Sequence, residues 1–94
     1  MVFVIKKLKY DTDKMKLISE RCSYNYEGKC FGDTLRYNGR NVKLWESNKG
    51  NWLLTYETDY TVCGKAITEN EAGDLLLKYD VERYEEIFGK LEEA

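Results

Sequence analysis

Apolar and polar positions follow two different periods in the first quarter of the chain. Alternation from Val4 to Tyr10, in a β-rich segment, predicts a strand over Val2–Tyr10. Beyond it, apolar residues recur at spacings of three and four, the period of one helix face, at Met15, Ile18 and Cys22. Asp11 or Thr12 can cap the amides of a helix start. The pattern therefore predicts a short amphipathic helix over Thr12–Arg21.

The middle of the chain has the features of an antiparallel meander. The strands it predicts are Thr34–Tyr37, Val42–Glu46, Trp52–Glu57 and a short Lys65–Ile67. Asn38-Gly39 is the preferred sequence of a type I′ hairpin turn, and Ser47–Gly50 predicts a second turn. Asp59–Gly64 is expected to be a loop or an edge. Alternation along the third strand places one set of side chains on a common face: Trp52, Leu54 and Tyr56.

The last third of the chain is predicted to be helical. Thr68-Glu69-Asn70-Glu71 has the form of a capping box, and an apolar stripe with Leu75 and Leu76 follows it. Asp80 is expected to cap a second helix that ends at Gly89 in a left-handed conformation. The buried face of that helix is expected to comprise Val81, Tyr84, Ile87 and Phe88. The fold class predicted is α+β: one antiparallel sheet of three to five strands, one N-terminal helix and two C-terminal helices.

The amino-acid composition and the net charge exclude or disfavour several classes of function. The chain has 94 residues, enough for a single domain over 1–94, and a formal net charge of −2, which disfavours a strongly basic nucleic-acid binder. It contains no His, so imidazole-based catalysis and His-ligated metal sites are excluded. No acid–base pair is marked by its context, and the glycines follow no phosphate-binding motif. We expect neither an enzyme nor a bound cofactor.

The chain has three cysteines, Cys22, Cys30 and Cys63, and none of their spacings is C-x-x-C. A zinc site would need a carboxylate as fourth ligand, so we expect no metal and three small, reduced side chains. A Cys22–Cys30 disulfide remains an alternative in an oxidising compartment. The apolar start, Met1–Ile5, is too short for a membrane span and precedes its lysines, unlike a signal peptide. We therefore expect a cytoplasmic protein.

Charge and aromatic residues indicate the candidate binding residues. Residues 1–50 carry eleven basic and six acidic side chains, whereas residues 51–94 carry four basic and eleven acidic ones. An acidic helical surface can occupy a groove that normally holds nucleic acid, although acids also serve an ordinary solvated helix face. Tyrosines in polar segments are typical interface anchors. The predicted partner-binding residues are Tyr24, Tyr26, Tyr60, Asp74, Glu82, Glu85 and Glu86.

Two alternatives use other parts of the predicted sheet. Basic and aromatic residues interleave along it, and such a surface can stack single-stranded DNA or RNA: Arg36, Arg40, Lys43 and Trp45. This pattern predicts a nucleic-acid-associated accessory factor. A structural homodimer is favoured instead if an exposed strand edge pairs with its copy.

Several segments together resemble a family of small accessory proteins encoded by phages, plasmids and other mobile elements of Firmicutes. They are Lys9–Asp13, Leu17-Ile18, Leu44–Glu46, Gly50–Tyr56, Thr68–Ala72 and Tyr84–Gly89. The loop Asp59–Gly64 and the stretch Cys22–Cys30 depart from the family pattern. The resemblance implies a protein of the host bacterial cytoplasm. Genes of this kind include anti-CRISPR proteins, so it implies a stoichiometric inhibitor that binds a CRISPR effector or another defence protein and occludes its nucleic-acid site.

Overall fold

The computed structural model describes residues 1–94, except for the side chain of Cys30. In the described chain, eight strands precede two α-helices. The strands are β1 (Val2–Ile5), β2 (Leu8–Asp11), β3 (Lys16–Ser19), β4 (Asn25–Cys30), β5 (Asp33–Asn38), β6 (Arg40–Glu46), β7 (Trp52–Glu57) and β8 (Val62–Ile67). A short 3₁₀ helix, η1 (Thr12–Lys14), precedes β3, and the α-helices are α1 (Glu69–Tyr79) and α2 (Val81–Phe88).

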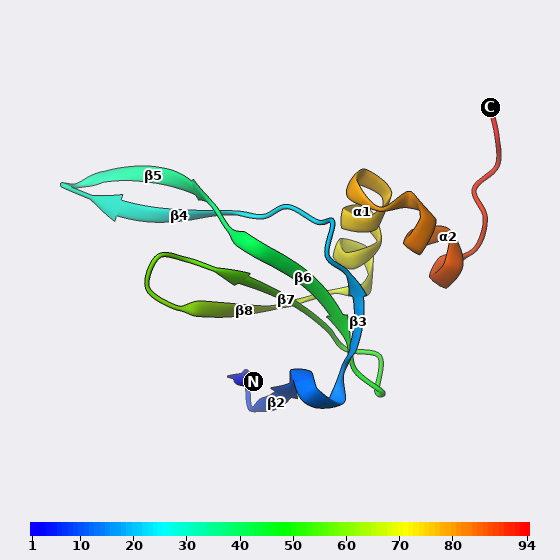
Figure 1. The fold of residues 1–94 in the computed structure, drawn as a ribbon, viewed down its shortest axis with the longest axis horizontal. Coiled ribbons are helices and arrows are strands. Elements are labelled where there is room, and N and C mark those ends of the chain that lie inside the picture. Colours follow the sequence, from blue (N-terminus) through cyan, green and yellow to red (C-terminus); the bar gives the residue numbers. More distant parts are fainter.

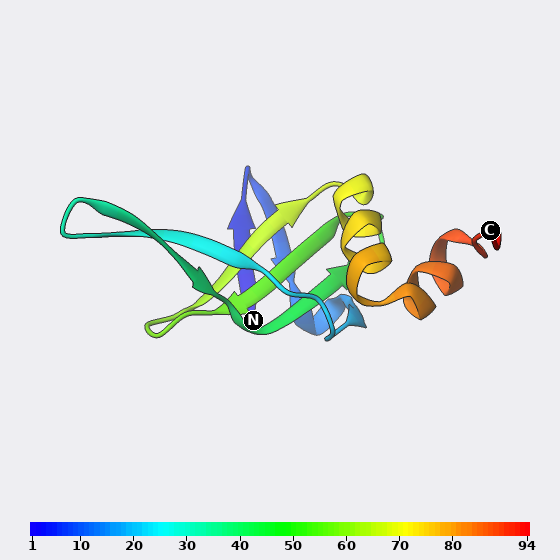
Figure 2. The ribbon, with the colours of Figure 1, turned by 90° about the horizontal axis from the view of Figure 1, so that it is seen from above.

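The strands form three separate antiparallel groups (Figure 1). A central sheet has the order β3-β6-β7-β8, and the pairs β1–β2 and β4–β5 are two-stranded hairpins. The β4–β5 hairpin, residues 25–38, is here called the arm. It projects from one end of a molecule that measures 48 × 33 × 20 Å, and α2 lies at the opposite end (Figures 1 and 2).

The central sheet buries side chains on both faces because different elements cover each one. On one face, Leu44, Trp52 and Leu54 belong to a buried cluster with Ala72 and Leu76 of α1. This arrangement confirms the common face predicted for Trp52, Leu54 and Tyr56, which packs on the core with Trp52 and Leu54 buried.

On the opposite face, Leu53 is fully buried and the indole N–H of Trp45 donates to the hydroxyl of Thr55 at 2.9 Å. The β1–β2 hairpin lies on this side (Figure 1). The ring of Phe3 lies so close to Gly64 that a Cβ there would come within 2.8 Å of it. Glycine at position 64 therefore permits the contact between the hairpin and the sheet.

The predicted fold class is wrong in its N-terminal helix and in its single sheet of three to five strands, since the described chain has eight strands in three sheets. Thr12–Arg21 forms η1 and then β3, which pairs with β6 and so joins a predominantly β-sheet structure. A bulge between Leu17 and Ser19 shifts the register, so that Ile18 and Ser19 are both buried. The helical spacing of apolar residues thus comes from a turn followed by a bulged strand. Backbone pairing with a sheet edge prevails over an isolated short helix, which is marginal in water.

Two turns differ from the predicted ones. The segment Val2–Tyr10 is a hairpin that turns at Lys6 and Lys7, with φ of 50° and 66°, where side-chain-bearing residues are uncommon. Asn38-Gly39 is not a hairpin turn, because β5 pairs with β4 and β6 pairs with β7. The arm turns instead at Phe31 and Gly32, whose φ values of 53° and 84° are positive as a type I′ turn requires.

Most of the remaining predicted elements are present in the structure. The strands Val42–Glu46 and Trp52–Glu57, the turn Ser47–Gly50 and the presence of both C-terminal helices are confirmed. The buried face predicted for the second helix is wrong at Val81, which is exposed, and Gly89 has φ of 106° and ψ of 158° instead of the left-handed helical conformation. In the capping box, the hydroxyl of Thr68 accepts from the amide of Glu71, and the Glu71 carboxylate accepts from the amide of Thr68, both at 3.1 Å. The predicted loop Asp59–Gly64 is partly strand, since β8 begins at Val62.

Candidate binding surfaces

A row of tyrosine rings fixes the root of the arm to the central sheet. The ring of Tyr56 on β7 lies 4.7 Å from Tyr24 and 5.6 Å from Tyr26, centroid to centroid. Tyr26 also stacks on Tyr37 of β5 at 5.4 Å. Burial, followed by the neighbouring Cys63 and tyrosines, raises the pKa of Tyr56 to about 12. Tyr24 and Tyr26, predicted to be exposed anchors, are therefore half-buried parts of the arm's attachment.

The exposed apolar residues of this end lie farther out. Phe31, at the tip of the arm, is 101% exposed, and Tyr60, in the turn between β7 and β8, is 97% exposed. Leu35 and Tyr37 are also exposed along the arm. Of these four residues, only Tyr60 is among the predicted partner-binding residues. The period-two alternation of Tyr24, Tyr26 and Gly28 was the available signal for a strand leading to Phe31.

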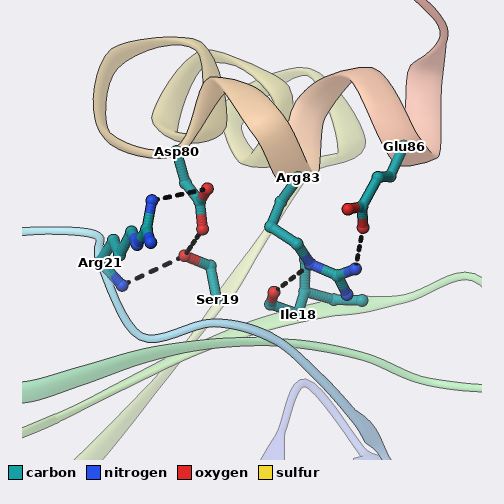
Figure 3. Close-up of polar contacts among 6 residues, drawn as sticks. All are labelled: Ile18, Ser19, Arg21, Asp80, Arg83 and Glu86. Carbon is teal, nitrogen blue, oxygen red and sulfur yellow. Dashed lines mark hydrogen bonds and ion pairs between the residues drawn. The ribbon is translucent and has the colours of Figure 1, made fainter.

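A buried polar contact positions the helices on the sheet (Figure 3). The hydroxyl of Ser19 donates to the carboxylate of Asp80 at 2.7 Å, and the guanidinium of Arg21 lies 3.8 Å from the same carboxylate. Asp80 occupies the N-cap position of α2, but its side chain makes no capping bond because it is directed to Ser19. From α2, Arg83 donates through Nε to the carbonyl of Ile18 at 2.7 Å.

The junction of α1 and α2 contains a hollow of about 410 Å³, here called the helical groove. Its lining comprises Glu69, Asn70, Gly73, Asp74, Leu77, Tyr84 and Phe88. The rings of Tyr84 and Phe88 are 5.0 Å apart and half-buried, whereas Glu69 and Asp74 are exposed. The groove thus combines aromatic rings with exposed carboxylates.

The four predicted acidic residues have different surroundings. Asp74 lines the helical groove, whereas Glu82 is exposed on α2 and lines a second hollow beside Arg83. Glu86 pairs with Arg83, and Glu85 accepts from the amide of Leu91 at 2.9 Å. Among the described side chains, no ion pair engages Asp74 or Glu82.

The predicted tyrosines and acids do not form one surface. The tyrosines lie on the arm, directly before it and in the neighbouring turn, and the acids belong to the helices at the opposite end of the long axis (Figures 1 and 2). The two groups therefore form two separate candidate interfaces.

The residues of the nucleic-acid alternative are individually engaged. Each of its cations forms an ion pair: Arg36 with Glu27, Arg40 with Asp59 and Lys43 with Glu20. Trp45 is half-buried and bonded to Thr55. This geometry gives no specific support to a single-stranded nucleic-acid platform at these positions.

The thiols of Cys22 and Cys63 are free. Burial raises the pKa of the Cys22 thiol, which disfavours the reactive thiolate. Cys30, the other half of the disulfide considered above, has its side chain outside the described part of the structure. Within the described side chains, no group of three or more Cys, Asp or Glu is placed to hold a metal ion.

Comparisons with family models, curated proteins and solved structures find no match to this chain. The resemblance to mobile-element accessory proteins therefore stays a prediction. Neither of the described helices has the length and apolar character needed to cross a membrane.

Proposed function

We propose that this chain is a stoichiometric protein inhibitor that binds a nucleic-acid-binding effector of a bacterial defence system through its helical groove. The observation that carries the proposal is the placement of the exposed, unpaired Asp74 beside the aromatic rings of Tyr84 and Phe88. The resemblance in sequence to mobile-element accessory proteins supports a CRISPR effector as the target.

The groove suits a basic side chain of the partner. Arginine and lysine have apolar stems and charged ends, so a stem can pack on Leu77 while the head reaches Asp74 or Glu69. A guanidinium can also lie on an aromatic face, which attracts cations. Between residues 69 and 94 the chain has nine acidic and three basic side chains, and the resulting potential favours approach to a basic surface.

The basic side chains that line nucleic-acid grooves make a nucleic-acid-binding effector a suitable partner for this acidic groove. Effectors hold phosphates with arginine and lysine, and a protein carboxylate placed at such a side chain competes with the phosphate for it. One bound inhibitor would occlude the groove sterically without any chemical step. Glu82 lies outside the groove, at the hollow beside Arg83, and adds to the negative charge of the helices. α2 is held in place by Asp80 and Arg83.

The test measures binding and inhibition with a panel of purified CRISPR effectors of different types. The wild-type chain should block target cleavage by one effector at a one-to-one ratio. The variant Asp74→Lys/Glu82→Lys should associate with that effector at least about tenfold more slowly at low salt, because charge complementarity acts mainly on the association rate. Failure to bind any effector contradicts the proposed target class.

The matched control is Asp13→Lys/Glu46→Lys, which makes the same change in net charge outside the two α-helices. Asp13 lies on η1 and Glu46 at the end of β6. This control should associate like the wild type. Equal association rates for all three proteins at low salt would contradict the helical groove as the binding surface, even if inhibition itself is observed.

A further inference from the structure

The arm has free strand edges on both sides. β4 and β5 pair only with each other in the described structure, over six residues each, and every residue of β5 is exposed. An isolated two-stranded hairpin is marginal in water, and an uncovered strand edge is a template for a further strand. We propose that two copies of this chain pair through the β4 edges of their arms, which lie antiparallel and form a four-stranded sheet.

The hydrogen-bonding pattern identifies the backbone groups that this edge presents. In an antiparallel pair, opposite residues alternate between bonding each other and directing their N–H and C=O outward. The amide of Gly39 donates to the carbonyl of Tyr24 at 2.8 Å, so the inward-bonding positions of β4 continue at Tyr26 and Gly28. The outward-directed positions on β4 are therefore Asn25, Glu27 and Lys29.

Charge selects one register for the pairing. When the two β4 strands are centred on Gly28, Glu27 of each copy lies opposite Lys29 of the other, and both positions are outward-directed. Centring the pair on Glu27 or on Lys29 would place two like charges directly opposite, which is destabilising. The sequence of the β4 edge is thus complementary to itself in one of these three registers.

The β5 edge lacks this complementarity. Its outward-directed positions are the partners of those on β4, namely Thr34, Arg36 and Asn38. They include a single charged residue, so no symmetric register brings opposite charges together there. This difference assigns the pairing to the β4 edge.

The same register matches the lengths of the two arms. Centring on Gly28 brings Phe31, at the tip of one arm, level with Asn25 at the root of the other. The exposed ring of Phe31 then reaches the end of the second arm at which the tyrosine row begins. Each tip is thereby placed against the other copy's root, and the assembly closes as a symmetric dimer.

The test follows the mass of the full chain by sedimentation over a range of concentrations. The wild type should dimerise reversibly. Glu27→Lys and Lys29→Glu should each weaken the homodimer at least about tenfold, since each places like charges across both symmetric contacts. An equimolar mixture of these two variants should dimerise again, because every cross-strand pair then joins opposite charges.

Proline provides the matched control for the edge. Lys29 and Thr34 are opposite each other in the hairpin, and the amides of both are directed outward. Lys29→Pro should abolish dimerisation and Thr34→Pro should not, because proline on an edge strand removes only the outward donor. Circular dichroism should show that both variants keep their strands.

Three results would overturn the proposal. The wild type could remain a monomer at protein concentrations up to roughly 1 mM, which would make the dimer too weak to be of interest. Its dimer could be insensitive to both charge reversals, or Thr34→Pro could abolish the dimer while Lys29→Pro leaves it intact. The proposal does not depend on the effector as target, because self-association is measured with the purified chain alone.

Discussion

The hydroxyl of Ser19 donates a 2.7 Å hydrogen bond to the carboxylate of Asp80, and both residues are buried. Ser19 ends a strand at the edge of the central sheet, whereas Asp80 joins the two helices. The contact links the N-terminal and C-terminal parts of the chain at the point where α1 turns into α2. Together with the hydrogen bond from Arg83 to the carbonyl of Ile18, this contact joins the helices to the edge of the sheet.

Ser19→Ala should lower the free energy of unfolding by about 1–3 kcal/mol, because it leaves a buried carboxylate without a donor. Urea unfolding measures the change. Ser23→Ala, at an exposed position nearby, should change stability by less than about 0.5 kcal/mol. In the Asp80→Ala background, Ser19→Ala should change the free energy of unfolding much less. Equal changes in the two backgrounds would show that the Ser19–Asp80 hydrogen bond contributes nothing to stability.

Gly64→Ala should destabilise the protein by about 1–3 kcal/mol, since the new Cβ would overlap the ring of Phe3. Thermal or urea unfolding gives the magnitude. The loss should be much smaller in a background of Phe3→Ala, where the ring is absent. A loss of the same size in both backgrounds would point to the backbone of β8 as its cause.

The cap of α1 should make stability depend on acid pH. The hydrogen bond from the backbone amide of Thr68, followed by the contact with its hydroxyl, lowers the pKa of Glu71 below its ordinary value of 4.5. The charged carboxylate therefore stabilises the folded state above pH 4.5, and this contribution is lost as the pH falls through the lowered pKa.

Glu71→Gln should remove this part of the pH dependence. The variant and the wild type should differ in thermal stability near neutral pH and converge in acid. Thr68→Ala should cost about 1 kcal/mol at neutral pH, as the loss of an N-cap usually does. A difference between wild type and Glu71→Gln that persists unchanged in strong acid would contradict the role of the charge.

Tyr56 should ionise later than a free tyrosine. Its pKa of about 12 lies above the ordinary value of 10, because burial disfavours the phenolate. The neutral ring supports the fold fully below pH 10, and this contribution is lost as the pH rises through 12. Absorbance of tyrosinate should show a late step that Tyr56→Phe removes, and a titration without such a step would be evidence against the buried row.

The sequence predicted best the elements that local chemistry specifies. The capping box at Thr68 and the alternating strand with Trp52 each contain their own signal within a few residues. The N-terminal helix was predicted wrongly because the residues around Ile18 take their structure from pairing with β6, which is distant in sequence. Similarly, Asn38-Gly39 has the composition of a turn, but Gly39 permits the close approach of Tyr56 and Tyr24 at the arm root.

The candidate surfaces were predictable only in part. Clustered acids in the sequence indicated Asp74 and Glu82, but the hollow beside Asp74 arises from the angle between two helices held by Ser19 and Arg83. Tyr24 and Tyr26 were predicted to be interface anchors because they lie in a polar segment of the sequence. Their burial depends on Tyr56, whose approach to the arm is a tertiary contact without a local signal.

The contact between Arg83 and Ile18 also limits strand pairing at one edge of the central sheet. β3 is an outer strand of the central sheet, and open outer strands allow molecules to stack into fibrils. Here the strand is short, a bulge interrupts its register, and the guanidinium of Arg83 occupies the carbonyl of Ile18. The carbonyl of Ile18 is therefore not free to accept a hydrogen bond from a strand of another molecule along this edge.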